Sequence, residues 1–205
     1  MAQQPAGAAA TPGRVILLNG TPSSGKTTIA RALWAQLEPP HWYRSIDDFR
    51  QGYRVRLEDP APTWDQLVRG FIRAVAAMAW SGHRVITESV ILPQWLDTYV
   101  DALDGLTVVF VGVRCPLAIA QQREEQRSDR PRGRVDLAVP DFDALHRDII
   151  YDVDFDTSIV TREVPLAGGR STAVVRIKES VLGQAHSLAA GSTRGHRSAP
   201  DGATT

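Results

Sequence analysis

The stretch GTPSSGKTT, residues 20–28, follows directly on the apolar run RVILLN, and this order constrains the fold more than any other feature of the 205-residue chain. Gly20, Gly25, Lys26 and Thr27 match the phosphate-binding pattern G-x-x-x-x-G-K-[ST], in which a strand, a glycine-rich loop and a helix follow one another. Glycines let a backbone wrap closely around an anion, and the helix that begins near Lys26 adds the positive end of its dipole. A chance Gly/Ser loop would not need this strand and helix around it.

The loop is therefore expected to bind the phosphates of a nucleotide. Its amides would face inward as an anion nest, Lys26 would reach the β- and γ-phosphates, and Thr27 would offer its hydroxyl to Mg²⁺. Lys26 is one of two lysines in an arginine-rich chain, which suits a position that needs a compact ammonium group. The predicted nucleotide-binding residues are Gly20, Thr21, Pro22, Ser23, Ser24, Gly25, Lys26, Thr27 and Thr28.

Apolar runs of strand length alternate along the chain with segments of helical period. Strands separated by helices predict an α/β fold, a P-loop NTPase three-layer sandwich with a doubly wound, mostly parallel five-stranded sheet. The longest helix is expected to begin at an N-cap at Thr63 and to end at Gly82. The predicted strands are 14–18, 42–46, 83–91, 106–113 and 151–158, and the predicted helices are 26–37, 63–82, 93–103, 116–127, 141–149 and 171–182.

Composition sets the domain limits and the expected surroundings of the protein. Residues 1–12 and 183–205 are small and polar and are expected to be disordered tails around one domain at 13–182. The net charge of zero argues against a nucleic-acid partner, and the apolar runs are too short to span a membrane. The single Cys115 fits a reducing cytoplasm, whereas the oligomeric state stays open.

Carboxylates follow two of the predicted strands. Asp47 and Asp48 come after the strand 42–46, and Glu88 and Ser89 end the apolar part of the third strand. Because ligands bind at the carboxyl ends of strands in such sheets, these side chains could take a proton from a hydroxyl or hold a cation. The alternatives are that one aspartate only caps a helix and that Glu88 only reaches solvent.

An arginine-rich segment after the fourth strand is predicted to be a lid over the phosphates, at about residues 127–140. Arginines neutralise the charge of a transferring phosphoryl group, and closure of such a segment excludes water. Arg127 and Arg130 would share one face of a continuing helix. The alternative is a solvated helix end, because acidic residues are mixed with the arginines.

These stretches together resemble the chloramphenicol 3-O-phosphotransferase family, a branch of P-loop small-molecule kinases near the shikimate and gluconate kinases. The resemblance covers about residues 14–158 and is carried most specifically by its later part. The matching stretches are RVILLNGTPSSGKTT, IDDF, RVITESVIL, VFVGVRCPLAIAQQREEQRSDRPRG and HRDIIYDVDFDTS.

The resemblance implies an ATP- and Mg²⁺-dependent kinase. Asp47 would be the base that acts on the acceptor hydroxyl, and Arg127 and Arg130 would be the lid arginines. The loop motif itself assigns Lys26 to the transferred phosphoryl group. The place of Glu88, at the end of the strand beside the loop strand, assigns it to the Mg²⁺ site together with Thr27. This chain departs from the family at two places. Glu88 and Ser89 stand where the family often carries an Asp–Asp pair, and residues 50–65 differ from the expected acceptor region.

The function that follows is the transfer of the γ-phosphate of ATP to a hydroxyl of a small molecule, with chloramphenicol or a related antibiotic as the first candidate and resistance as the outcome. A kinase of another metabolite alcohol or nucleoside, and a nucleotide-binding regulator without activity, are the alternatives. The sequence has no obvious guanine-recognition signature after the predicted strand 106–113, which argues against a GTPase. The predicted substrate residues are Asp48, Phe49, Tyr53, Ser89 and Trp95, with Trp42 as a further candidate wall, and each aromatic residue could instead be part of the core.

Overall fold

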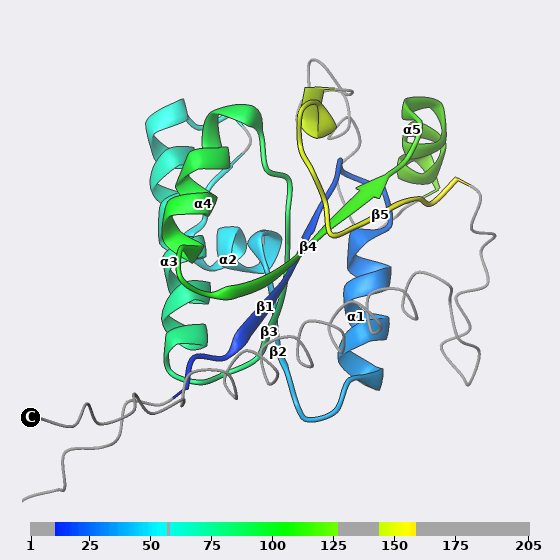
Figure 1. Cartoon of the computed structure of the whole chain (residues 1–205). Coiled ribbons are helices and arrows are strands. Elements are labelled where there is room, and N and C mark those ends of the chain that lie inside the picture. The colour runs from blue at the N-terminus through cyan, green and yellow to red at the C-terminus, as the bar shows by residue number, and fades with distance from the viewer. Residues whose placement is uncertain (1–10, 57, 127–143, 159–205) are drawn as a thin grey trace, which may run out of the picture.

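The computed structural model describes residues 11–56, 58–126 and 144–158, which form a five-stranded parallel sheet between helices (Figure 1). The strand order is β2-β3-β1-β4-β5, so the first strand lies in the middle. All four neighbouring pairs of strands are parallel, which confirms the predicted α/β fold and its five strands. The strands are β1 (Arg14–Asn19), β2 (Trp42–Ser45), β3 (Val85–Ser89), β4 (Thr107–Arg114) and β5 (Val153–Asp156).

The central strand β1 is apolar throughout because both of its faces are covered. Ile16 and Leu18 face the helix α1 (Lys26–Gln36), where they join one hydrophobic cluster. Val15 and Leu17 point to the other side and join a second cluster with α3 (Ala61–Trp80) and α4 (Leu96–Leu103). Side chains that alternate between two buried faces explain the continuous apolar run in the sequence. The helices on the two sides of the sheet are seen in Figure 1.

Several helices differ from the prediction. The helix α2 (Ile46–Tyr53) was not among the predicted helices. The segment 93–103 divides into a 3₁₀ turn η1 (Pro93–Trp95) and α4, and α5 is Leu117–Glu125. The predicted helix at 141–149 is wrong where the structure describes it, because only a 3₁₀ turn η2 (Ala144–His146) forms and Asp148 takes a left-handed φ of 58° that interrupts a helix.

The predicted start of α3 is wrong, and its predicted end is correct. The N-cap is Pro60 rather than Thr63, and no side chain caps the helix. Proline in the first turn costs nothing there, because its missing N–H would have no partner within the helix. At the other end Gly82 has a φ of 88°, and its N–H donates to the carbonyl of Ala79 at 2.9 Å. Glycine therefore ends this helix, as the sequence predicted.

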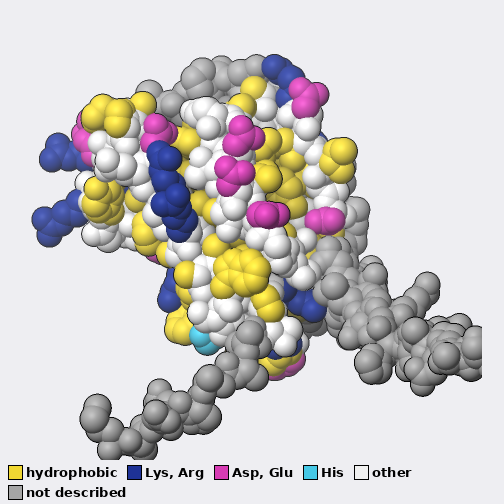
Figure 2. All heavy atoms as spheres, turned by 60° about the vertical axis from the view of Figure 1, so that its left-hand side comes forward, with side chains coloured by type: hydrophobic (Ala, Val, Ile, Leu, Met, Phe, Trp, Pro, Cys, Tyr) yellow, Lys and Arg dark blue, Asp and Glu magenta, His cyan; other side chains and the backbone are white. Residues whose placement is uncertain are grey.

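Some predictions of domain organisation lie outside the described residues. These are most of the N-terminal tail, the segment 127–140, the helix at 171–182 and the tail at 183–205. Among the helices that the structure describes, none has both the length and the apolarity needed to cross a membrane. The face shown in Figure 2 carries basic, acidic and apolar side chains interspersed over the α3 and α4 side, in keeping with the balanced charge of the chain.

Gly112 of β4 tests how tightly β4 and the segment leading into β5 are packed. A Cβ atom at this position would lie 2.6 Å from Cδ2 of Tyr151, whose ring packs against the strand. Gly112→Ala is therefore expected to lower the free energy of unfolding by about 1–3 kcal/mol, which urea denaturation would measure.

Gly52→Ala is the matched control for this substitution. Gly52 lies in α2, and nothing stands within 4 Å of its added Cβ. Alanine should stabilise the helix by up to about 1 kcal/mol, since glycine is the weaker helix former. An unfolding free energy that Gly112→Ala leaves unchanged would show that the Tyr151 ring is free to move away.

Candidate active site

The loop between β1 and α1 has the backbone shape that an anion site requires. Ser23 and Gly25 have positive φ angles of 60° and 98°, which turn successive peptide groups and let their amides converge. The Lys26 ammonium group donates to the carbonyl of Thr21 at 2.7 Å and is 8% exposed, so the loop is closed on itself. Gly20 is required by packing, because a Cβ there would lie 2.3 Å from the carbonyl oxygen of Val113.

The structure brings together Thr27 and Glu88, the two residues that the sequence suggested as metal ligands. The Thr27 hydroxyl donates to Glu88 Oε2 at 3.0 Å, across the space between α1 and β3. Glu88 is 4% exposed, and its other oxygen accepts a hydrogen bond from the hydroxyl of Tyr43 in β2. Burial and the charge of Glu88 raise the pKa of Tyr43, so its hydroxyl stays protonated and acts as a donor. Tyr43 was not among the predicted site residues.

The chemistry of this pair fits Mg²⁺. The ion prefers oxygen ligands and is usually held by one or two carboxylates together with substrate phosphates, rather than by a complete protein cage. Thr27 and Glu88 supply a hydroxyl and a carboxylate beside the loop. Within the described residues no group of three or more histidine, cysteine or acidic side chains could hold a metal.

Asp47 and Asp48 lie in the first turn of α2, at the carboxyl edge of the sheet. Neither aspartate caps the helix: the cap is Ser45, whose Oγ accepts from the N–H of Asp47 at 3.1 Å. The expectation that one aspartate serves as the cap is therefore wrong. Asp47 Oδ1 lies 3.7 Å from Nε of Arg50, one helical turn further on. The charge of Asp48 contributes to the raised pKa of Tyr43, after burial and Glu88.

The predicted aromatic walls Phe49, Tyr53 and Trp95 lie on α2 and η1, the elements that follow β2 and β3. Phe49 packs on Phe71 with ring centroids 5.6 Å apart, and Tyr53 is exposed at the end of α2. Trp95 lies just after β3, donates from Nε1 to Asp65 at 2.7 Å and stacks on Trp64. Sequence reasoning missed both of these partners at the start of α3.

Trp42 and Ser89 do not lie where an acceptor would meet the loop. Trp42 begins β2 and pairs with Val85 at the amino end of the sheet, so the interpretation of Trp42 as a wall of the pocket is wrong. Ser89 is 1% exposed, and its hydroxyl accepts from Tyr99 at 2.6 Å. The side chain of Ser89 is therefore part of the core on the α4 side.

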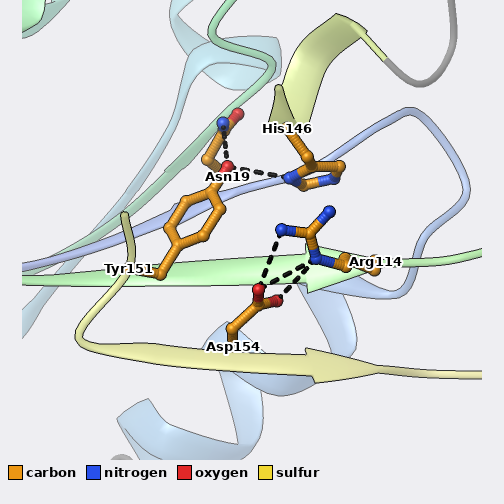
Figure 3. A network of polar contacts seen from close by, with 5 residues as sticks. All are labelled: Asn19, Arg114, His146, Tyr151 and Asp154. Carbon is orange, nitrogen blue, oxygen red and sulfur yellow. Dashed lines mark hydrogen bonds and ion pairs between the residues drawn. The ribbon is translucent and has the colours of Figure 1, made fainter. Parts of the chain in front are cut away.

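A buried polar network begins at Asn19, the residue before the loop (Figure 3). Its Nδ2 donates to the hydroxyl of Tyr151 at 2.9 Å, and its Oδ1 accepts from the N–H of Ile91 at 2.9 Å. The Tyr151 hydroxyl lies 2.8 Å from Nδ1 of His146. Burial raises the pKa of Tyr151 to about 12. Asn19 thus joins the start of the loop, the segment after β3 and the segment before β5.

Arg123 and Thr157 contact the loop from the far end of the described chain. Arg123 of α5 and Thr157 after β5 hydrogen-bond each other, and Thr157 also bonds the carbonyl of Ser24. Both residues stand in stretches that carried the family resemblance, but neither was predicted to touch the loop. Arg127 and Arg130 lie outside the described residues.

Glu88→Gln tests the metal assignment. The amide keeps the size of the side chain but loses the charge that attracts a divalent cation. The concentration of Mg²⁺ needed for tight ADP binding is expected to rise about tenfold or more, as measured by calorimetry at a series of Mg²⁺ concentrations. Asp97→Asn, an exposed substitution in α4, is the control. An unchanged Mg²⁺ dependence would remove Glu88 from the metal site.

Comparisons with known proteins indicate the family of the chain. A family model described as chloramphenicol phosphotransferase-like protein matches residues 13–166. The chain is 28% identical over 175 residues to "Putative O-phosphotransferase Rv2636" of Mycobacterium tuberculosis, and the match covers 71% of this chain and 76% of the relative.

Two solved structures share the fold at low sequence identity. The Mycobacterium tuberculosis APS kinase CysC, in complex with AMPPNP and APS, has a TM-score of 0.60 at 15% identity and covers 83% of this chain and 98% of its own. A gluconokinase of Sinorhizobium meliloti has a TM-score of 0.57 at 15% identity and covers 91% and 99%. At these identities the likeness extends to the fold alone.

Proposed function

Because this chain belongs to the chloramphenicol phosphotransferase-like family, we propose that it is a kinase that transfers the γ-phosphate of ATP to a hydroxyl of a small molecule. The observation that carries the proposal is the hydrogen bond of Thr27 with Glu88 beside a closed phosphate loop. A loop that only bound an anion would not need a buried carboxylate aimed at the hydroxyl that follows its lysine.

The proposed mechanism assigns one task to each residue. The loop amides and Lys26 bind the phosphates, and Thr27 with Glu88 would hold Mg²⁺, which supplies charge neutralisation at the β- and γ-phosphates. Asp47 accepts the proton of the acceptor hydroxyl as its oxygen attacks the γ-phosphorus in line and the bond to the β-phosphate oxygen breaks. Arg127 and Arg130 are proposed to stabilise the charge on the transferred group.

The acceptor is proposed to lie against α2, the start of α3 and the turn after β3. Phe49, Trp64 and Trp95 present aromatic rings there, and such surfaces suit an acceptor with an apolar or aromatic body. Chloramphenicol or a related antibiotic is the first candidate because of the family. The departures at residues 50–65 favour a test of other alcohols and of nucleosides as well.

The experiment that tests this function is a measurement of ADP release with a panel of acceptors. Chloramphenicol, related antibiotics, nucleosides, shikimate and gluconate would be compared, each with ATP and Mg²⁺, and the phosphorylated product would be identified by mass spectrometry. Phosphorylated chloramphenicol is the expected product. Tight ATP binding without phosphorylation of any alcohol would instead indicate a nucleotide-binding regulator.

Asp47→Asn tests the proposed base. Asparagine keeps the size and most of the hydrogen bonding of aspartate but cannot accept a proton, so kcat is expected to fall about 10²- to 10⁴-fold. The affinity for ATP should change little, because the loop and not α2 holds the nucleotide. The kcat of the wild type should also fall at acid pH as the base becomes protonated, and the variant should lose this acid limb.

Asp48→Asn is the matched control in the same turn of α2. Its charge contributes to the raised pKa of Tyr43, the donor to Glu88, so the substitution should alter the response to Mg²⁺ or the stability, with a milder loss of kcat. A nearly normal rate for the variant at position 47, together with an inactive variant at position 48, would move the base to Asp48.

A further inference from the structure

One carbonyl group of the phosphate loop is held from outside the loop. Thr157, which directly follows β5, is 6% exposed, and its hydroxyl donates to the carbonyl oxygen of Ser24 at 2.7 Å. The two residues are 133 positions apart in the sequence. A methyl carbon of Thr157 would lie 3.7 Å from a Cβ atom added to Gly25, so the contact extends to the next residue of the loop.

Arg123 fixes the position of Thr157. Its Nη1 donates to the Thr157 hydroxyl at 2.9 Å, and its Nη2 donates to the Thr157 carbonyl at 2.8 Å. Nη1 also lies 3.4 Å from the carbonyl oxygen of Ser24. A planar guanidinium group can hold the side chain and the main chain of one residue at once, which a single ammonium group cannot do with the same geometry.

The strands β4 and β5 determine the position of Thr157 beside the loop. The N–H of Thr157 donates to the carbonyl of Arg114, the last residue of β4, at 2.9 Å. The Arg114 guanidinium group in turn binds both carboxylate oxygens of Asp154 in β5, each at 2.9 Å from Nε (Figure 3). The register of β4 and β5 therefore determines where the Thr157 hydroxyl points.

The peptide geometry gives this contact a role in nucleotide binding. In a trans peptide the C=O of one residue and the N–H of the next point in opposite directions. Donors that draw the Ser24 carbonyl toward Thr157 therefore turn the N–H of Gly25 away from it. In a phosphate loop the amides provide the anion site, so the direction of this N–H matters directly.

We propose that Thr157 and Arg123 are positioning residues that hold the peptide between Ser24 and Gly25 with its N–H directed at the phosphates. They act through the loop and need no contact with the nucleotide. The proposal rests on nucleotide binding at the loop, which is part of the proposed function, but not on the identity of the acceptor. The consequence is that losing either residue weakens the binding of any polyphosphate, whether or not it carries a nucleoside.

Thr157→Val in the full-length chain tests this inference. Valine keeps the shape of threonine and removes the hydroxyl. Displacement of a fluorescent ATP analogue would give the dissociation constants of ATP and of inorganic tripolyphosphate, both with Mg²⁺ and without any acceptor. Both are expected to rise about tenfold, the equivalent of one hydrogen bond to the loop, and Thr157→Ser should restore them.

Two further variants separate positioning from a general loss of stability. Thr87→Val removes another buried threonine hydroxyl, one with no hydrogen-bond partner among the described residues, and should leave both constants unchanged. Arg123→Lys keeps the charge but not the fork of donors, and should weaken both ligands alike even if Thr157→Val folds poorly. Thermal melting would be recorded for each variant.

Three results would overturn the proposal. Wild-type constants for both ligands in Thr157→Val and Arg123→Lys would show that the contact is only structural. A rise for ATP alone, with tripolyphosphate unchanged, would mean that these residues contact the nucleoside instead. A wild-type protein that binds neither ligand would remove the phosphate site itself. Binding without phosphorylation of any alcohol would contradict only the proposed function, since no acceptor enters this measurement.

Discussion

The candidate site depends on the register of β3 between its two neighbours. Leu18 of β1 and Ser45 of β2 are both paired with Glu88, so the carboxyl ends of three strands meet at one edge of the sheet. Glu88 then points to the α1 side, where Thr27 and Tyr43 reach it. A slip of β3 by one residue would turn this carboxylate toward the apolar helices α3 and α4. Such a slip would bury the carboxylate without Thr27 and Tyr43 as partners, so the observed register also determines the place of the proposed metal ligand.

Much of this architecture could be predicted because buried parallel strands leave a clear apolar signal. The sequence predicted all five strands and the first helix close to the positions that the structure shows. The helix α2 was missed although Ile46, Phe49 and Tyr53 recur at helical spacing, because it has only eight residues and buries none of them completely. Thr63 was taken as a cap because it is a good capping residue, but Pro60 and the proline after it begin the helix three residues earlier.

The residue types of the site could be predicted, but the contacts between distant segments could not. The loop, Glu88 and the aspartates were expected from their place after strands, which is a local property of the sequence. The hydrogen bonds of Tyr43 with Glu88 and of Thr157 with Ser24 join separate elements, and their geometry depends on strand order and register. Ser45, and neither aspartate, is the N-cap of α2 because it stands directly before the first residue of the helix.

The distance in sequence between Ser24 and Thr157 also bears on the synthesis of the chain. The ribosome makes the loop early and residue 157 another 133 residues later, a delay on the order of ten seconds at ordinary rates of translation. The neighbours of the central strand β1, which are β3 and β4, are likewise synthesised after it. A nucleotide in the cell would thus meet a finished loop only when nearly all of the domain has emerged. Its binding would stabilise the folded domain and not the growing chain.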